Sequence, residues 1–198
     1  LIFDFINGFH DTANAIATSV STRALQPNHA VMMAAGLNFL GAMVSTGVAK
    51  TIGGDIVSSP VHIDEKIIIA ALIGAITWNL FTWKIGLPSS SSHALIGGLI
   101  GAVLISAGMS GLNWYGIGKI FLALILSPAI AFCTGIIIMN VIFRAFERFS
   151  PHFINDKFRR MQILSAAAIA FSNGSNDAQK SMGIITLALF SGGFIAEF

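Results

Sequence analysis

The sequence predicts an all-α integral membrane protein, and three observations support this fold class. Of the 198 residues, 55% are hydrophobic and only 10% are charged, whereas a soluble domain has about 25% charged residues. The mean hydropathy is +0.79, so too little charge is present to cover a water-facing surface. The apolar runs are long and continuous, which favours helices over the ~10-residue alternating segments of a transmembrane barrel.

The apolar runs predict the helices in order. A run of about 14 residues, 94–107, is shorter than the ~20 residues of a full crossing and predicts a re-entrant half-helix. Pro128 is expected to kink the long run that contains it. The predicted helical segments are 1–24, 30–52, 66–84, 94–107, 119–143 and a last one from 161 onward.

Basic residues concentrate between the last two of these segments. Five of the eleven lysines and arginines fall within residues 144–160, and the positive-inside rule places such a stretch in the cytoplasm. We therefore expect a basic cytoplasmic loop there. A nucleic-acid-binding patch is not expected, because stacking aromatic residues and a soluble fold around it are both missing.

Two polar clusters interrupt the apolar sequence with the same spacing. A Phe, an Asn, a Gly and an Asp recur at an offset of 166 residues: Phe5, Asn7, Gly8 and Asp11 against Phe171, Asn173, Gly174 and Asp177. Glycine and short polar side chains favour a broken or irregular helix here, and such backbone is tolerated at membrane depth only where it is buried or lines a cavity. The repeat predicts a transport site built from a duplicated unit.

A serine run marks the start of the predicted half-helix. Four hydroxyls, on Ser89, Ser90, Ser91 and Ser92, follow Pro88 and precede the apolar run. The backbone N–H groups of a helix start, together with these hydroxyls, suit an oxyanion such as phosphate or sulfate. A plain helix cap is the alternative. His93 can donate to the anion or titrate, or can make a structural hydrogen bond.

The two aspartates are costly in apolar surroundings, by about 2.5 to 3.5 kcal/mol each at a helix centre. We expect Asp11 and Asp177 to serve a cation, a proton or a partner side chain. Cation binding beside an anion site couples the entry of the two ions, which is symport; the alternative is a structural pair of an aspartate with Lys180 or Arg23. Asparagines supply carbonyl oxygens for hard cations and amide groups for anions: Asn7, Asn14, Asn173 and Asn176.

Enzyme motifs are missing from the sequence. No Gly-x-Ser-x-Gly nucleophile elbow occurs, the serine run lacks the Gly-Lys-Ser/Thr ending of a nucleotide-binding P-loop, and no Cys/His metal spacing is found. The protein is therefore not expected to be an enzyme, and no cofactor is expected.

Three stretches in order resemble the signatures of the inorganic phosphate transporter (PiT) family, in its bacterial low-affinity type. Residues 5–15 resemble the first signature, residues 78–80 with 86–93 the re-entrant hairpin motif, and residues 171–177 the second signature. The resemblance implies an inverted-repeat secondary transporter in the plasma membrane, with broken helices, a re-entrant hairpin, Na⁺ or H⁺ coupling and a homodimer. It implies one transmembrane domain, 1–198, with a first repeat at 1–143, a cytoplasmic loop at 144–160 and the start of a second repeat at 161–198.

The resemblance also implies roles for the polar residues. Asp11 and Asp177, with the nearby Asn7 and Asn176, are expected to serve the cation, as Na⁺ ligands if coupling is to sodium. The phosphate group is assigned to the serine run and its polar neighbours: Ser89, Ser90, Ser91, Ser92, His93, Asn14 and Asn173.

Two departures from the family pattern qualify these expectations. No second hairpin motif follows Asp177, so a fragment with an incomplete site is expected. Sodium-coupled members carry a Glu in the second segment, whereas residues 45–51 contain none and include Lys50. This favours proton coupling with a metal–phosphate substrate, formed with Mg²⁺ or another divalent ion. The alternatives are a sulfate permease of the same family and a membrane channel or receptor.

Overall fold

A computed structural model describes residues 1–44, 56–57, 64–87 and 89–195, except for the side chain of Phe9, and within them every element is helical apart from one isolated bridge, Val57 to Leu112. Pro88 and the 45–51 stretch lie outside the described residues. The elements are α1 (Ile2–Ser21), α2 (Pro27–Ala42), α4 (Glu65–Ile85), α5 (Ser91–Ala107), the short 3₁₀ helix η1 (Met109–Gly111), α6 (Trp114–Phe146) and α7 (Pro151–Ser191).

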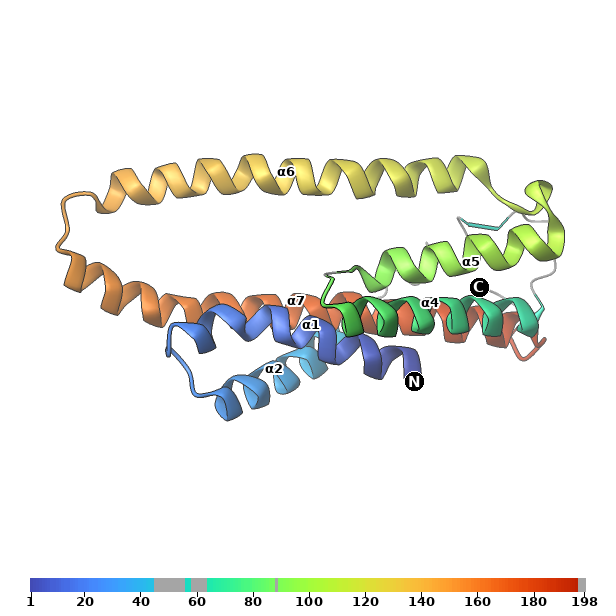
Figure 1. Cartoon of the computed structure of the whole chain (residues 1–198), viewed down its shortest axis with the longest axis horizontal. Coiled ribbons are helices and arrows are strands. Elements are labelled where there is room, and N and C mark those ends of the chain that lie inside the picture. The colour runs from blue at the N-terminus through green and yellow to red at the C-terminus, as the bar shows by residue number, and fades with distance from the viewer. Residues whose placement is uncertain (45–55, 58–63, 88, 196–198) are drawn as a thin grey trace.

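The helices lie along one long axis, with α6 on one side and α7 on the other (Figure 1). Helices α1, α2 and α4 pack against α7, and α5 packs against α4. The described part of the chain includes two helices long and apolar enough to cross a membrane, α4 and α6, and a shorter apolar helix, α5. The predicted segment 66–84 is thus confirmed as a full-length apolar helix.

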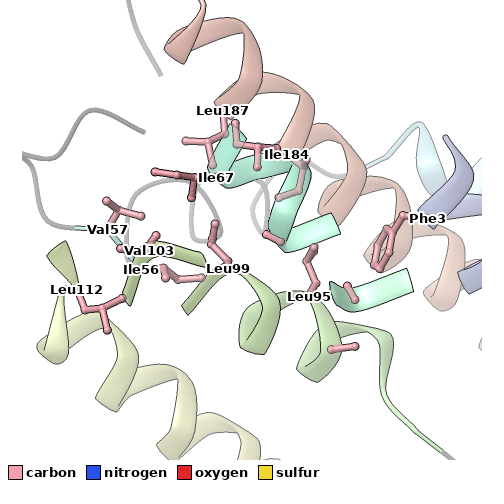
Figure 2. Close-up of a cluster of buried hydrophobic side chains, with 14 of the residues drawn as sticks. Phe3, Ile56, Val57, Ile67, Leu95, Leu99, Val103, Leu112, Ile184 and Leu187 are labelled. Carbon is pink, nitrogen blue, oxygen red and sulfur yellow. The ribbon is translucent and has the colours of Figure 1, made fainter. Parts of the chain in front are cut away.

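Helices α4 and α5 form an antiparallel hairpin whose tip carries the serine run (Figure 1). Their buried faces build the larger apolar core, to which α1 contributes Phe3 and α7 contributes Ile184 and Leu187 (Figure 2). Gly98 allows the close approach, because a Cβ atom there would collide with the Ala71 carbonyl group. The re-entrant character of this hairpin stays a prediction.

The contact between α2 and α7 is the most extensive in the fold, and two glycines make it close. A Cβ atom on Gly174 would collide with the backbone of Asn38, and one on Gly41 would collide with the carbonyl oxygen of Phe171. Small residues let helices approach until their backbones touch, which maximises dispersion contacts where lipid supplies no hydrophobic driving force. Gly174 therefore serves packing.

The predicted breaks at the polar clusters are wrong. Gly8 lies inside the continuous helix α1, and Gly174 lies inside the continuous helix α7. One glycine in a helix costs only about 0.5 to 1 kcal/mol relative to alanine, and the side chain of His10 bonds back to the Ile6 carbonyl oxygen at 2.8 Å without breaking the turn. Flanking apolar turns and close packing outweigh the local preference.

The predicted basic loop at 144–160 is also largely wrong, because most of this stretch is helical. Helix α6 ends at Phe146, and α7 begins at Pro151 after a short connection. Ser150 caps α7 by accepting from the Phe153 amide, and proline is favoured at the first helical position. Aromatic contacts of Phe149 with Phe146 and Phe153 hold the turn.

Candidate functional site

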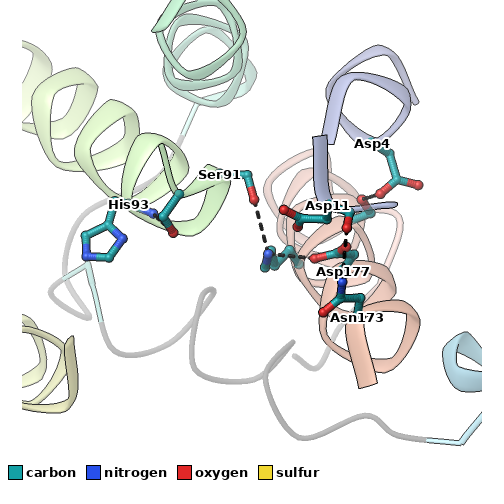
Figure 3. Close-up of polar contacts among 9 residues, drawn as sticks. Asp4, Asp11, Ser91, His93, Asn173 and Asp177 are labelled. Carbon is teal, nitrogen blue, oxygen red and sulfur yellow. Dashed lines mark hydrogen bonds and ion pairs between the residues drawn. The ribbon is translucent and has the colours of Figure 1, made fainter. Parts of the chain in front are cut away.

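Three helices bring the predicted polar residues together. Helices α1 and α7 pack against each other, so Asp11 on α1 faces the turn of α7 that carries Asn173 and Asp177 (Figure 3). Helix α5 begins at Ser91 and directs this first residue toward the same turn. Side chains from three segments that are far apart in the sequence thereby share one polar region.

Lys180 is the centre of this polar region. Its Nζ lies 2.7 Å from Oδ1 of Asp177 and 3.3 Å from Oγ of Ser91 (Figure 3). The side chains of Lys180 and Asp177 are only 10% and 13% exposed, so the ion pair is shielded from water. Of the alternatives that the sequence left open, a pair of Asp177 with Lys180 is the one formed. The ammonium group links the acid of α7 to the serine run.

Asp11 lies on the other side of Asp177. Its carboxylate interacts electrostatically with Asp177, Lys180 and His10, and its backbone oxygen accepts from Nδ2 of Asn173 at 3.4 Å. With both acids ionised, their two negative charges exceed the single positive charge of the ammonium group. A proton or a metal cation would balance the excess negative charge.

The four serines differ in their contacts. Ser89 shares a hydrogen bond of 2.9 Å with Thr82 of α4, which fastens the tip of the hairpin. Ser90 caps α5 by accepting from the His93 amide at 3.4 Å, so the plain-cap alternative holds for this residue. Ser91 is buried against Lys180, and Ser92 is half-buried. Only Ser91 is in contact with the charged residues.

Three of the predicted site residues are exposed instead. His93 points away from Asp11 and Asp177 (Figure 3), and Asn14 and Asn176 are solvent-exposed within this chain. Asn7 is buried, with 1% of its surface exposed. The structure thus gathers Asp11, Asp177, Asn173 and Ser91 but not the whole predicted set.

Two buried asparagine amides lack a hydrogen-bond partner among the described residues. Asn7 on α1 and Asn79 on α4 are 1% and 2% exposed, and neither the oxygen nor the nitrogen of their amides is bonded. A buried polar group without a partner costs about 1 to 3 kcal/mol. Native structures keep such groups where a ligand or a water satisfies them, which marks these two amides as candidate ligand contacts.

A small cleft opens beside Asp177 and Asp4. It has a volume of ≈ 200 Å³ and is lined by residues of α1, α2 and α7: Asp4, Gly8, Thr12, Ala35, Asn38, Ala42, Gly174, Asp177 and Ala178. Pockets for drug-sized ligands span about 300 to 1,000 Å³, so this cleft suits a small ion. Its polar atoms are mainly carboxylate, hydroxyl and amide oxygens, the ligands of hard cations.

Sequence reasoning left several of these residues out of the site. The sequence predicts Lys180 only as an alternative partner of an aspartate, and the 166-residue offset that aligns the two clusters aligns it with Asn14. Asn79 lay inside the hairpin motif without an assigned role. The bond from Ser181 to Oδ1 of Asp4, at 2.8 Å, joins α7 to α1, and the offset of 166 residues does not pair these two residues.

Comparisons with known proteins identify relatives of this chain. The profile of the phosphate transporter family matches residues 7–155 and 146–195. A probable low-affinity inorganic phosphate transporter of Bacillus subtilis (strain 168) is 55% identical over 96% of this chain and 58% of its own length. A protein of the same description from Streptomyces halstedii is 48% identical over 88% of this chain and 82% of its own length. The chain spans a little over half of the Bacillus relative.

A solved structure has the same fold. It is described as the sodium-dependent phosphate transporter, and it superposes with a TM-score of 0.86 over 99% of this chain and 67% of its own length. The sequences are 24% identical, so this likeness concerns the helical architecture.

Proposed function

Because the chain belongs to the phosphate transporter family and its relatives are named as transporters, we propose that the protein is a cation-coupled symporter that moves inorganic phosphate inward across the plasma membrane. The observation that carries this proposal is the contact of Lys180 with both Asp177 and Ser91. It joins an acid suited to a cation with a hydroxyl suited to an oxyanion, and symport requires both at one place.

Phosphate binds, in this proposal, where the start of α5 meets the polar turn of α7. The Ser91 hydroxyl and the Lys180 ammonium supply donors, and the N-terminus of α5 adds the positive end of its dipole. The half-buried Ser92 and the amide of Asn173 complete the set from this chain. His93 and Asn14 would need a change of conformation or a neighbouring segment to bind phosphate, and Asn176 would need the same to serve the cation.

The coupled cation acts at Asp11, in this proposal. Among the residues that the structure describes, Asp11 has no ion pair, whereas Asp177 is already paired with Lys180. A proton that binds Asp11 would remove the excess negative charge and favour the approach of an anion. A divalent ion carried as metal phosphate would achieve the same with its own charge. The missing Glu and the presence of Lys50 within 45–51 also support proton coupling.

The remaining expectations belong to the same proposal. We assign the basic stretch 144–160 to the cytoplasmic side by the positive-inside rule. Most of it is helical, at the end of α6 and the start of α7. Helix α7 has 41 residues and so spans roughly 60 Å, twice the ~30 Å hydrocarbon core. Its basic first turns can therefore extend into the cytoplasm. The protein is proposed to act as a homodimer.

Uptake of labelled phosphate tests the function. The protein at its full natural length is produced in cells that lack other phosphate uptake systems, and Na⁺, external pH and Mg²⁺ are varied independently. We expect saturable uptake that rises with external acidity and with Mg²⁺ and does not depend on Na⁺. Uptake that ignores the proton gradient would contradict the proposed coupling, and uptake that never saturates would favour a channel.

Competition with sulfate tests the substrate. Phosphate carries a proton near neutral pH and sulfate does not, so a carboxylate acceptor in the site favours phosphate. A tenfold excess of sulfate is expected to leave phosphate uptake unchanged. Strong inhibition by sulfate would move the assignment to the sulfate permease alternative.

A further inference from the structure

The two polar clusters differ at one charged position. The offset of 166 residues that pairs Asp11 with Asp177 also pairs Asn14 with Lys180. In the first copy the position three residues after the aspartate holds a neutral, exposed amide. In the second copy it holds a buried ammonium group. The second copy therefore has a fixed positive charge at a place where the first copy has none.

The ammonium group of Lys180 contacts the kind of atoms that hold a hard cation. Its two neighbours are a carboxylate oxygen of Asp177 at 2.7 Å and the hydroxyl of Ser91 at 3.3 Å. Carboxylate and hydroxyl oxygens are ligands of small hard cations. These two come from different helices, α7 and α5, so the ammonium sits between elements as a bound ion would.

The surroundings make a positive charge at this position necessary. Asp177 is largely buried, and Asp11 adds a second carboxylate nearby. A buried carboxylate without a partner is strongly unfavourable. Without Lys180, the two acids would have to bind a mobile cation or a proton to remain in the fold.

We propose that Lys180 is a built-in cation that fills a sodium-type site formed by Asp177 and Ser91, and that it sets the ion specificity of the transporter by excluding Na⁺ from the second copy of the repeat. The part of this inference that concerns ion specificity rests on the proposed function. The part that concerns the structure, a cation site occupied by the Lys180 side chain, does not depend on transport.

Thermal denaturation of the purified full-length protein tests the inference. The melting midpoint is measured while NaCl replaces choline chloride at constant ionic strength, because choline is too large for the vacated space. A ligand that binds the folded state alone raises the midpoint with its concentration. We expect a midpoint independent of Na⁺ in the wild type and one that rises steadily with the logarithm of Na⁺ concentration in Lys180→Ala.

Three further variants complete the experiment. Lys180→Asn reproduces the residue of the first copy, and its melting midpoint should show the same dependence on Na⁺. Lys180→Arg keeps the charge and should remain independent of Na⁺. The double variant Asp177→Asn with Lys180→Ala removes both charges and should lose the dependence again.

The outcomes separate the inference from the proposed function. Equal dependence on Na⁺ in the wild type and in Lys180→Ala would overturn the inference, and so would a dependence that survives in the double variant. If neither neutral variant folds at any Na⁺ concentration while Lys180→Arg does, Na⁺ cannot replace the ammonium and the inference is also overturned. A wild type that takes up no phosphate would instead overturn the proposed function and leave the melting comparison valid.

Discussion

The turn of α1 that contains Asn7, Gly8 and Asp11 and the turn of α7 that contains Asn173, Gly174 and Asp177 share residues and spacing, yet they occupy different environments. On α7, Gly174 is pressed against the backbone of α2. On α1, nothing in the described chain lies within 4 Å of where a Cβ atom of Gly8 would be. The same sequence element is a packing contact in one copy and an open surface in the other.

The polar side chains differ in the same way. Asp177 has an ion pair with Lys180 at 2.7 Å, while Asp11 has electrostatic neighbours but no lysine on its own helix. Asn173 donates to the Asp11 carbonyl oxygen, while the amide of Asn7 is buried with no partner among the described residues. The comparison teaches that one copy is structurally satisfied by this chain and the other retains groups available for ligands.

The largest expected difference between the copies concerns the aspartates. Asp177→Asn leaves Lys180 buried without its counter-ion, and breaking such a pair costs about 3 to 5 kcal/mol, so a large fall in the melting midpoint is expected. Asp11→Asn breaks no ion pair and is expected to abolish phosphate uptake with little loss of stability. Melting curves and labelled-phosphate uptake of the two variants check this. Full uptake by Asp11→Asn would remove the coupling role from Asp11.

The glycines give the next largest difference. Gly174→Ala places a methyl group against the backbone of Asn38 and forces α2 and α7 apart, at an expected cost of about 1 to 3 kcal/mol. Gly8→Ala meets open space and gains about 0.5 to 1 kcal/mol of helix propensity. The matched pair is compared by thermal denaturation in detergent. Equal destabilisation by the two substitutions would contradict the packing role of Gly174.

The asparagines separate ligand binding from structure. Asn7→Leu replaces an unpartnered buried amide by an apolar group of similar size, which is expected to raise stability by about 1 to 3 kcal/mol while phosphate uptake falls. Asn173→Leu removes a long hydrogen bond from a half-buried residue and is expected to change stability by less than about 1 kcal/mol. Asn79→Leu on α4 should behave like Asn7→Leu. Stabilised variants with normal uptake would show that these amides serve no ligand.

The sequence predicted the helical class and most helix positions, because apolar runs such as 66–84 report burial in lipid or protein directly. It failed where a local preference competed with packing. Gly8 and Gly174 suggested breaks, but close contacts that no local pattern reveals keep α1 and α7 continuous. It failed again at 144–160, where charge suggested a loop although Ser150 and Pro151 carry a helix-start signal.

For the site, the sequence identified the acids and the serine run but could not assign a separate role to each of the four serines. Which hydroxyl faces α7 depends on the phase of α5 relative to a helix that begins 60 residues later. The sequence could not identify the ion-pair partner of Asp177 for the same reason. Residues three apart on a helix share a face, so the sequence allowed Lys180 as the partner of Asp177. Only the fold shows that the same ammonium group also donates to the hydroxyl of Ser91.

The smallest expected effects concern the serine run, and they distinguish a helix cap from a phosphate-binding site. Ser91→Ala removes the hydroxyl that Lys180 contacts at 3.3 Å; the loss of a hydrogen bond worth about 0.5 to 1.5 kcal/mol corresponds to a roughly two- to tenfold higher KM for phosphate. Ser90→Ala removes only the cap of α5 and should lower stability by about 1 kcal/mol with an unchanged KM. Uptake kinetics and melting midpoints of both variants are compared. A KM that stays unchanged in Ser91→Ala would reduce the whole run to helix capping and hairpin fastening, and the oxyanion would then have to be bound by Lys180 and the start of α5 alone.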